Sequence, residues 1–182
     1  MMLDRLHLQH YTADEARELV DQLVDVYLDA HAKDGPLYND HRYRRQLAAH
    51  VSRDGWALVA ASVDGDLVGY IYGFPLSHDT KWWEGIQEPV PQGFTEEDGR
   101  RTFAVSELLV RPAWQRRGIA RALHGEMIGR RAEQRATLLV RPDNAAAHAA
   151  YHSWGWSEAA QLQPSWKGAP TFDVLVRTIV VD

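Results

Sequence analysis

Apolar residues along the chain follow two spacings, and the change from one to the other predicts where strands and helices lie. Apolar and polar residues alternate over 3–10, which is typical of a strand. Two apolar runs, 56–63 and 67–74, are typical of further strands, and the stretch Asp64-Gly65-Asp66 between them favours a hairpin turn. The first part of the chain therefore predicts a sheet that contains a β-hairpin.

Helical spacing appears twice within the same part of the chain. Thr12 and Glu15 form a capping box, and the helix that they begin has apolar residues on one side as far as Ala30. Gly35-Pro36 breaks the chain, and 40–51 then predicts a second helix with apolar residues four apart.

From residue 103 onward, strands and helices alternate. The pattern predicts strands over 103–110, 136–140, 156–162 and 171–181, and helices over 119–131 and 143–153. Strands that alternate with helices, together with hairpin-like pairs, predict an α/β sheet of mixed direction. No repeat or linker divides the sequence, so residues 1–182 are expected to form a single domain.

The stretch 110–121 joins a predicted strand to a predicted helix, and its composition favours an anion-binding loop. Pro112 ends the strand, and Gly118 lies where the loop becomes a helix. The first amides of a helix have no intrahelical partners and lie at the positive end of its dipole. Arg116, Arg117 and Arg121 flank them, so the stretch predicts a diphosphate site. The alternative is an ordinary strand-to-helix turn with solvated arginines.

Two motifs in this half of the chain resemble those of the GNAT superfamily, the GCN5-related N-acetyltransferases. The loop Gln115-Arg116-Arg117-Gly118-Ile119-Ala120 is similar to the family's acetyl-CoA signature, Gln/Arg-x-x-Gly-x-Gly/Ala. Downstream, the family pattern N-x-x-A-x-x-x-Y-x-x-x-G-F is matched, with Trp in place of Phe, by Asn144, Ala147, Tyr151, Gly155 and Trp156. Two loose motifs in the correct order are more specific than either alone. The residue-level match is confined to 103–156.

This resemblance implies a GNAT fold, with a central mixed, mostly antiparallel twisted sheet of about six or seven strands and about four helices, splayed at the acetyl-CoA site. It implies acetyl-CoA as co-substrate, with main-chain contacts at Leu108, Leu109 and Val110. The diphosphate is then expected to lie against Gln115, Arg116, Arg117, Gly118, Ile119, Ala120 and Arg121. Asn144 is either a further cofactor contact or simply the cap of its helix.

Two residues are candidates for moving protons. Glu107 interrupts an apolar strand beside the expected thioester site, where partial desolvation favours a raised pKa and a role as general base. The resemblance implies that Tyr151 is the general acid that protonates the coenzyme thiolate. The structural alternatives are a hydrogen-bonded Glu107 and a Tyr151 that packs its helix onto the sheet. Ser106 has no base partner that the sequence identifies, which favours direct attack by the amine.

The connection 77–101 has no clear periodicity and is longer than most loops. It contains six acidic and three basic residues, a net charge of −3, together with Trp82 and Trp83. An acidic loop with an exposed indole suits a cationic amine, so the candidate substrate residues are Trp82, Trp83, Glu84 and, in the loop before the second helix, Tyr38. The alternative is a solvated loop that Trp82 or Trp83 pins to the core.

Composition excludes several classes of function. The net charge of −5 argues against non-specific nucleic-acid binding, and the absence of cysteine excludes disulfides and a cysteine acyl-enzyme. No membrane span or signal peptide is recognisable, so the protein is expected to be cytoplasmic and without a membrane partner. Nine histidines form no metal-binding spacing, and no metal is expected.

The sequence thus predicts an acetyl-CoA-dependent N-acetyltransferase that acts on a primary amine, favouring a small cationic molecule, by direct attack in a ternary complex. Two alternatives stay open: a non-catalytic acyl-CoA-binding or regulatory domain, and a protein N-terminal or lysine acetyltransferase. The apolar final run 174–181 permits a homodimer without requiring one.

Overall fold

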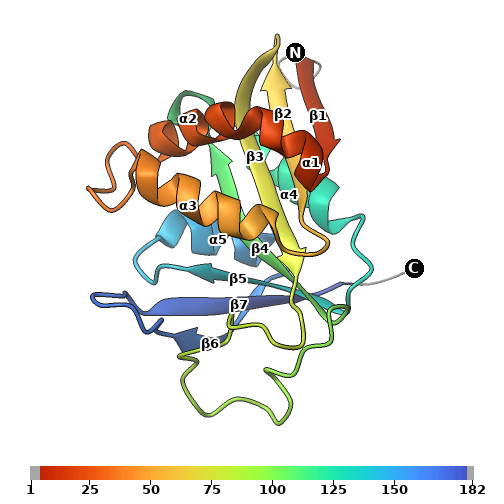
Figure 1. The fold of residues 1–182 in the computed structure, drawn as a ribbon, viewed down its shortest axis with the longest axis vertical. Coiled ribbons are helices and arrows are strands. Elements are labelled where there is room, and N and C mark those ends of the chain that lie inside the picture. Colours follow the sequence, from red (N-terminus) through yellow and green to blue (C-terminus); the bar gives the residue numbers. More distant parts are fainter. Residues whose placement is uncertain (1–4, 180–182) are drawn as a thin grey trace. The chain divides into compact units, whose positions relative to one another are not determined.

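The computed structural model describes residues 5–179, and its strands form a mixed sheet (Figure 1). The seven strands are β1 (Leu6–Tyr11), β2 (Ala57–Val63), β3 (Asp66–Pro75), β4 (Thr102–Val110), β5 (Arg135–Val140), β6 (Ser157–Leu162) and β7 (Phe172–Thr178). The helices of the described residues are α1 (Ala13–Ala16), α2 (Val20–Ala30), α3 (Asp40–Val51), α4 (Ile119–Ile128) and α5 (Ala145–Ser153). The predicted α/β class and mixed sheet are confirmed.

The chain divides into two compact units, and β4 contributes residues to both. The first unit comprises Met1–Phe74 and Val105–Arg130, and the second comprises Pro75–Ala104 and Arg131–Asp182. Each unit is therefore built from two separate stretches of sequence. The expectation of a single domain stays a prediction.

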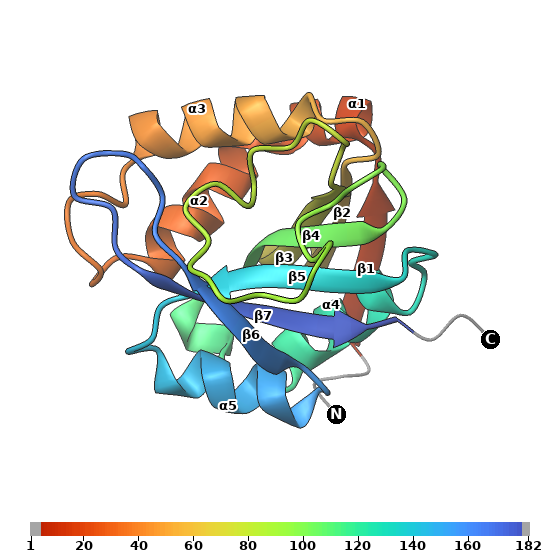
Figure 2. The same ribbon diagram turned by 90° about the horizontal axis from the view of Figure 1, so that it is seen from below.

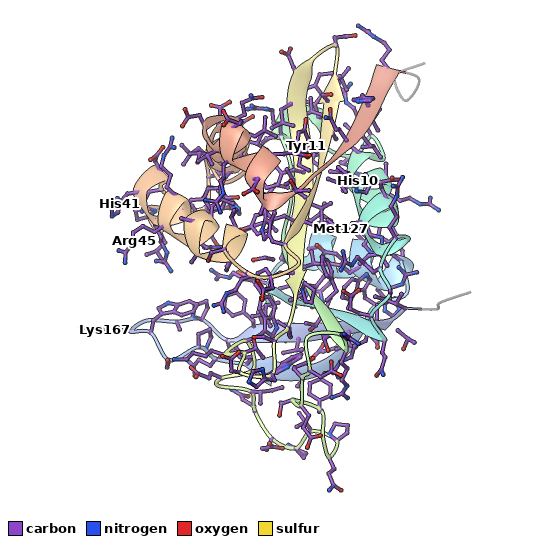
Figure 3. The ribbon with its side chains drawn as sticks, turned by 45° about the vertical axis from the view of Figure 1, so that its right-hand side comes forward. His10, Tyr11, His41, Arg45, Met127 and Lys167 are labelled. Carbon is purple, nitrogen blue, oxygen red and sulfur yellow. The ribbon has the colours of Figure 1, made fainter. Side chains whose placement is uncertain are left out.

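In the first unit, β1, β2 and β3 pair antiparallel in sequence order. The turn between β2 and β3 has positive φ at Asp64 (52°) and Gly65 (89°), as a two-residue type I′ hairpin requires. Helices α2 and α3 lie on one face of these strands and α4 lies on the other (Figure 1). Figure 3 shows His41 and Arg45 on the outward side of α3, and His10 of β1 beside α4. The His10 Nε2 atom is 2.8 Å from an Oε1 atom of Glu126 on α4.

In the second unit, β4 pairs with β5 in parallel over three residue pairs, from Thr102–Arg135 to Ala104–Thr137. Strands β5 and β6 both pair antiparallel with β7, and α5 lies against this part of the sheet (Figure 2). Val174 and Leu175 of β7 are buried within the unit. These two residues of the apolar final run thus contribute to the core of the unit, and a homodimer stays a prediction.

The predicted element ends differ from the observed ends at several places. The helix begun by the Thr12–Glu15 capping box is interrupted by a 3-10 turn, Arg17–Leu19, before α2. Helix α4 ends at Ile128 rather than at 131. The Gly129 amide makes the last helical bond, to the Gly125 carbonyl at 2.9 Å, and the Arg130 amide bonds instead to the Met127 carbonyl, three residues back, at 3.4 Å. Leu3 of the first predicted strand and Val180 and Val181 of the last lie outside the described residues. No described helix has both the length and the apolar character that crossing a membrane demands.

Candidate active site

The loop between β4 and α4 leaves the first amides of α4 directed out of the helix. After β4 the chain makes one 3-10 turn, Pro112–Trp114, and then adopts positive φ at Arg116 (62°) and Gly118 (82°). The first bond of α4 runs from the Ala122 amide to the Gly118 carbonyl, at 3.0 Å. The amides that precede Ala122 therefore point away from the helix end, as an anion site requires.

The same loop has room for a ligand. A Cβ placed on Gly118 meets no atom within 4 Å, so the space in front of this residue is open. The side chains of Arg116, Arg117 and Arg121 are exposed, and the Arg117 guanidinium stacks 5.3 Å from the Trp114 ring. An open helix N-terminus flanked by three cations fits a diphosphate.

Gln115 holds the loop against the strand that precedes it. Its side-chain amide donates to the Val110 carbonyl at 3.0 Å. This hydrogen bond favours a positioning role for Gln115 over direct contact with a cofactor. Leu109 and Val110 are buried, and a Cβ on Gly69 of β3 would lie only 2.6 Å from the Leu109 carbonyl oxygen. A glycine at 69 is therefore what lets β3 approach this end of β4 so closely.

Glu107 lies on β4 of the first unit, in a desolvated setting. Burial raises the pKa of its carboxyl from 4.5 to about 8, and a hydrogen bond from Gln46 on α3, at 3.2 Å, opposes the rise. The residue as a whole is half-buried, although the carboxyl itself is desolvated. The direction of this shift agrees with the expectation, and the role of Glu107 as general base stays a prediction.

Phenol side chains surround this carboxyl from three elements: Tyr27 of α2, Tyr43 of α3, and Tyr70 and Tyr72 of β3. Burial raises the pKa of each above its usual value, and the charge of Glu107 raises it further, so all four stay neutral. The Tyr70 hydroxyl donates to the Leu23 carbonyl at 3.1 Å and accepts from the Tyr43 hydroxyl at 2.5 Å. These bonds fix the hydroxyls of Tyr43 and Tyr70, and neither of them involves the Glu107 carboxyl.

Aromatic rings continue from this cluster toward the loop before α3. Tyr27 stacks on Tyr43, with ring centroids 3.7 Å apart, and packs against His31 at 4.6 Å. His31 in turn stacks on the half-buried Tyr38 at 4.3 Å, and its Nδ1 atom is 2.7 Å from a carboxylate oxygen of Asp34. Tyr38, a predicted substrate residue, is therefore the outer member of a row of rings that leads to the surroundings of Glu107.

Sequence reasoning missed the partner of Ser106. The Ser106 hydroxyl lies 3.1 Å from Nδ1 of His50, and the Tyr72 hydroxyl lies 2.9 Å from the same nitrogen. The sequence identifies no base partner for Ser106, and the fold brings a histidine beside it. Gln46 and His50 are one turn apart on α3, and this helical spacing was the available signal, but nothing in the sequence tells which strand they meet.

Asn144 and Tyr151 belong to the second unit. The Asn144 side-chain oxygen accepts from the Ala147 amide at 3.1 Å, so this residue caps α5. The ring of Tyr151 packs edge-on against Trp154 and Trp156, at 5.6 and 5.7 Å. Both contacts orient the half-buried phenol, and its role as general acid stays a prediction.

The connection 77–101 is pinned to the core of the second unit, as the structural alternative predicted. Trp83 is 6% exposed, and its Nε1 atom donates to Glu97 at 3.1 Å. Glu97, with a fully buried side chain, is paired with Arg135 of β5 at 3.0 Å. The expectation of an exposed indole is therefore wrong for Trp83, because this ring packs on Phe94 and Arg135. Trp82 is half-buried and Glu84 is exposed.

Comparison with known proteins places the chain in a family. The model of the acetyltransferase (GNAT) family matches residues 20–156, so the chain belongs to this family, whose members are acetyl-group transferases. No curated protein matches the sequence.

Solved structures share the fold at low identity. The ribosomal-protein-S18-alanine N-acetyltransferase of Escherichia coli is 17% identical with a TM-score of 0.66, over 97% of this chain and 96% of that one. Aminoglycoside 6'-acetyltransferase type Ii is 15% identical with a TM-score of 0.68, over 97% and 99%. The PaiA N-acetyltransferase of Thermoplasma acidophilum, in complex with coenzyme A, is 10% identical with a TM-score of 0.56, over 95% and 98%. At these identities the likeness concerns the fold alone.

Proposed function

We propose that the protein transfers the acetyl group of acetyl-CoA to a primary amine of a small cationic molecule, by direct attack of the amine. The observation that carries this proposal is a desolvated carboxyl, Glu107, on the strand that leads into an open, arginine-flanked helix N-terminus. Family membership supports the transfer of an acetyl group. The solved structure of similar fold that contains coenzyme A supports acetyl-CoA as the donor.

The donor is held by the loop and by β4. The open amides before Ala122 and the guanidinium groups of Arg116, Arg117 and Arg121 bind the diphosphate. Main-chain groups of Leu108, Leu109 and Val110 bind the pantetheine arm as a neighbouring strand would. Because the Val110 carbonyl already accepts from Gln115, the pantetheine arm uses the other main-chain groups of this segment. The thioester supplies an acyl carbon that an amine can attack.

Glu107 takes a proton from the acceptor. An alkylammonium ion must lose a proton before its nitrogen can attack, and a carboxyl with a pKa of about 8 is matched to that task near neutral pH. A bound cation lowers the pKa of Glu107 because it stabilises the carboxylate. Tyr151 donates a proton to the leaving thiolate, since a phenol stays protonated at neutral pH, and the acetylated nitrogen releases its second proton to solvent.

A cationic acceptor suits the approach to Glu107. The half-buried ring of Tyr38, at the outer end of the row, is the aromatic group that a cation can approach, and the carboxylate of Asp34 lies beside His31. An aminoglycoside or a polyamine has the required charge. Trp83 and Arg135 anchor the connection 77–101 within the second unit.

The test is release of coenzyme A thiol from acetyl-CoA in the presence of a panel of polyamines, aminoglycosides and short peptides with free N-termini. We expect turnover with polyamines or aminoglycosides, and a kcat/KM that rises with pH around a midpoint near 8. Glu107→Gln should lower kcat/KM by about 100-fold or more and remove that rise.

Each other outcome of this screen names a different function. Turnover with peptides alone identifies a protein N-terminal acetyltransferase. Tight binding of acetyl-CoA without thiol release for any amine identifies a non-catalytic acyl-CoA-binding domain.

A further inference from the structure

Two consecutive residues of β4 reach the same helix. Ser106 lies 3.1 Å from His50, and Glu107 accepts from Gln46 at 3.2 Å, and both partners are on α3. In a regular strand, neighbouring side chains project to opposite faces of the sheet. The two contacts to one helix therefore indicate that the strand departs from regular alternation between Ser106 and Glu107, as at a β-bulge. Such a departure needs contacts that hold it in place.

His50 is the centre of those contacts. Its Nδ1 atom lies within hydrogen-bonding distance of both the Ser106 and the Tyr72 hydroxyls, while its ring packs against Phe74 at 5.2 Å. Burial, together with the charge of Arg53, lowers the pKa of His50 to about 4, so the ring is neutral near pH 7. One ring nitrogen thus ties β4 to β3, and it does so through α3.

A serine beside a histidine also suggests a nucleophile and its base, but two observations disfavour that role. The Nδ1 atom is shared with Tyr72, so it does not serve Ser106 alone. An imidazole whose pKa is about 4 is a weak base and is poorly suited to remove the proton of a serine hydroxyl. The geometry fits an anchor better than it fits a nucleophile.

We infer that His50 is a positioning residue, which holds the irregular turn of β4 through Ser106 and so aims the Glu107 carboxyl at the acceptor amine. This inference rests on the proposed function of Glu107. The single bond from Gln46 is long for a hydrogen bond and fixes only one carboxylate oxygen. The anchor at Ser106, one residue away, restrains the backbone from which the Glu107 side chain projects.

Titration of the Glu107 carboxyl by NMR tests this inference without relying on turnover. Removal of the anchor lets the side chain move toward solvent, so we expect His50→Leu and Ser106→Ala each to lower the pKa of Glu107 by about one unit or more. His50→Asn keeps a polar atom near the position of Nδ1 and should restore most of the wild-type value. His41→Leu, on the outward side of the same helix, is the matched control and should change nothing.

Kinetics supply the second readout. Displacement of a catalytic group by about 1 Å costs up to 100-fold, so His50→Leu and Ser106→Ala should each lower kcat by about tenfold or more while the Kd of acetyl-CoA stays within about twofold. Because His50 acts through Ser106, the double variant should be no slower than the slower single variant. Ser106→Ala keeps the experiment decisive if His50→Leu does not fold.

Four results would overturn the inference: an unchanged pKa of Glu107 in both variants, effects on kcat that multiply in the double variant, a silent Ser106→Ala, or an acetyl group trapped on Ser106. If the wild-type protein turns over no amine at all, the proposed function fails instead. The NMR titration then still decides whether His50 positions Glu107.

Discussion

Glu107 illustrates how much the surroundings of one residue decide its chemistry. The carboxyl lies among four neutral phenols and receives one amide hydrogen bond, from Gln46. Desolvation outweighs that bond, so the residue holds its proton to a higher pH than an exposed glutamate does. The same imbalance that suits a general base also makes the folded state sensitive to pH.

The effect on stability has a definite sign. The pKa of Glu107 is about 8 in the folded state and 4.5 as its ordinary value, so its contribution is complete below pH 4.5 and is lost as pH rises through 8. Glu107→Gln has no such loss. We therefore expect the variant to gain stability relative to wild type between pH 4.5 and pH 9, by at most about 5 kcal/mol. Urea unfolding at a series of pH values measures the difference.

The exposed Glu18→Gln is the control, and its stability should run parallel to that of wild type across the same pH range. A constant difference between Glu107→Gln and wild type at every pH would mean that Glu107 titrates normally.

The candidate role of a single residue could be predicted from the sequence where the residues next to it indicate that role. Glu107 stands out because it interrupts an apolar strand, and Gly118 because it precedes a helix. His50 and Gln46 carry only their helical spacing as a signal, which does not predict their role, because that role depends on which strand α3 meets. The predicted exposure of Trp83 was wrong for the same reason, because its partner Arg135 is far along the chain and only folding brings the two together.

The predicted bounds of helices and loops agree with the observed ones where residues close in sequence determine them. Helix α3 has the predicted bounds, because Asn39 caps its first turn and Tyr43, Leu47 and Val51 bury one face. The break between α1 and α2 was not predicted, since one apolar pattern runs through both. The motif 115–120 predicted the loop before α4, because the needed glycine and arginines are contiguous.

Glycine substitutions in that loop and elsewhere separate the effect of backbone strain on stability from an effect on acetyl-CoA binding. Gly118 has φ +82° and open space in front of it, and Gly99 in the long connection has φ +84° and open space as well. Valine at either position should cost about 1–3 kcal/mol of stability because of backbone strain. Only Gly118→Val should weaken acetyl-CoA binding, by about tenfold or more, since its side chain enters the proposed cradle. Isothermal titration calorimetry measures the affinities, and equal acetyl-CoA affinity in the two variants would place the coenzyme elsewhere.

The long connection gives a prediction of a different kind. Arg135 is 11% exposed and is paired with Glu97, whose side chain is fully buried. Arg135→Met leaves that carboxylate without its ion pair, and the expected loss is about 3–5 kcal/mol in chemical unfolding. Arg130→Met removes an exposed pair with Glu126 and should cost less than about 1 kcal/mol. A similar small loss for both variants would show that the connection is not held by the buried pair.

For the molecule as a whole, β4 is the element that matters most, because its first three residues belong to one compact unit and the rest to the other. Unfolding either unit removes part of a strand that the other needs. We therefore expect one calorimetric transition for the whole chain, in keeping with a single domain.

Acetyl-CoA should move that transition as a whole, although the proposed diphosphate loop lies within the first unit. At 100 times its Kd the ligand adds about 2.7 kcal/mol, which in a chain of this length corresponds to a rise in Tm of about 5–11 °C. High salt should reduce the rise, because the arginines of the loop are exposed. Differential scanning calorimetry with and without acetyl-CoA, on wild type and Gly118→Val, measures it. Two calorimetric transitions, of which acetyl-CoA moves only one, would mean that the two units unfold independently. Each unit would then be stable without the part of β4 that belongs to the other.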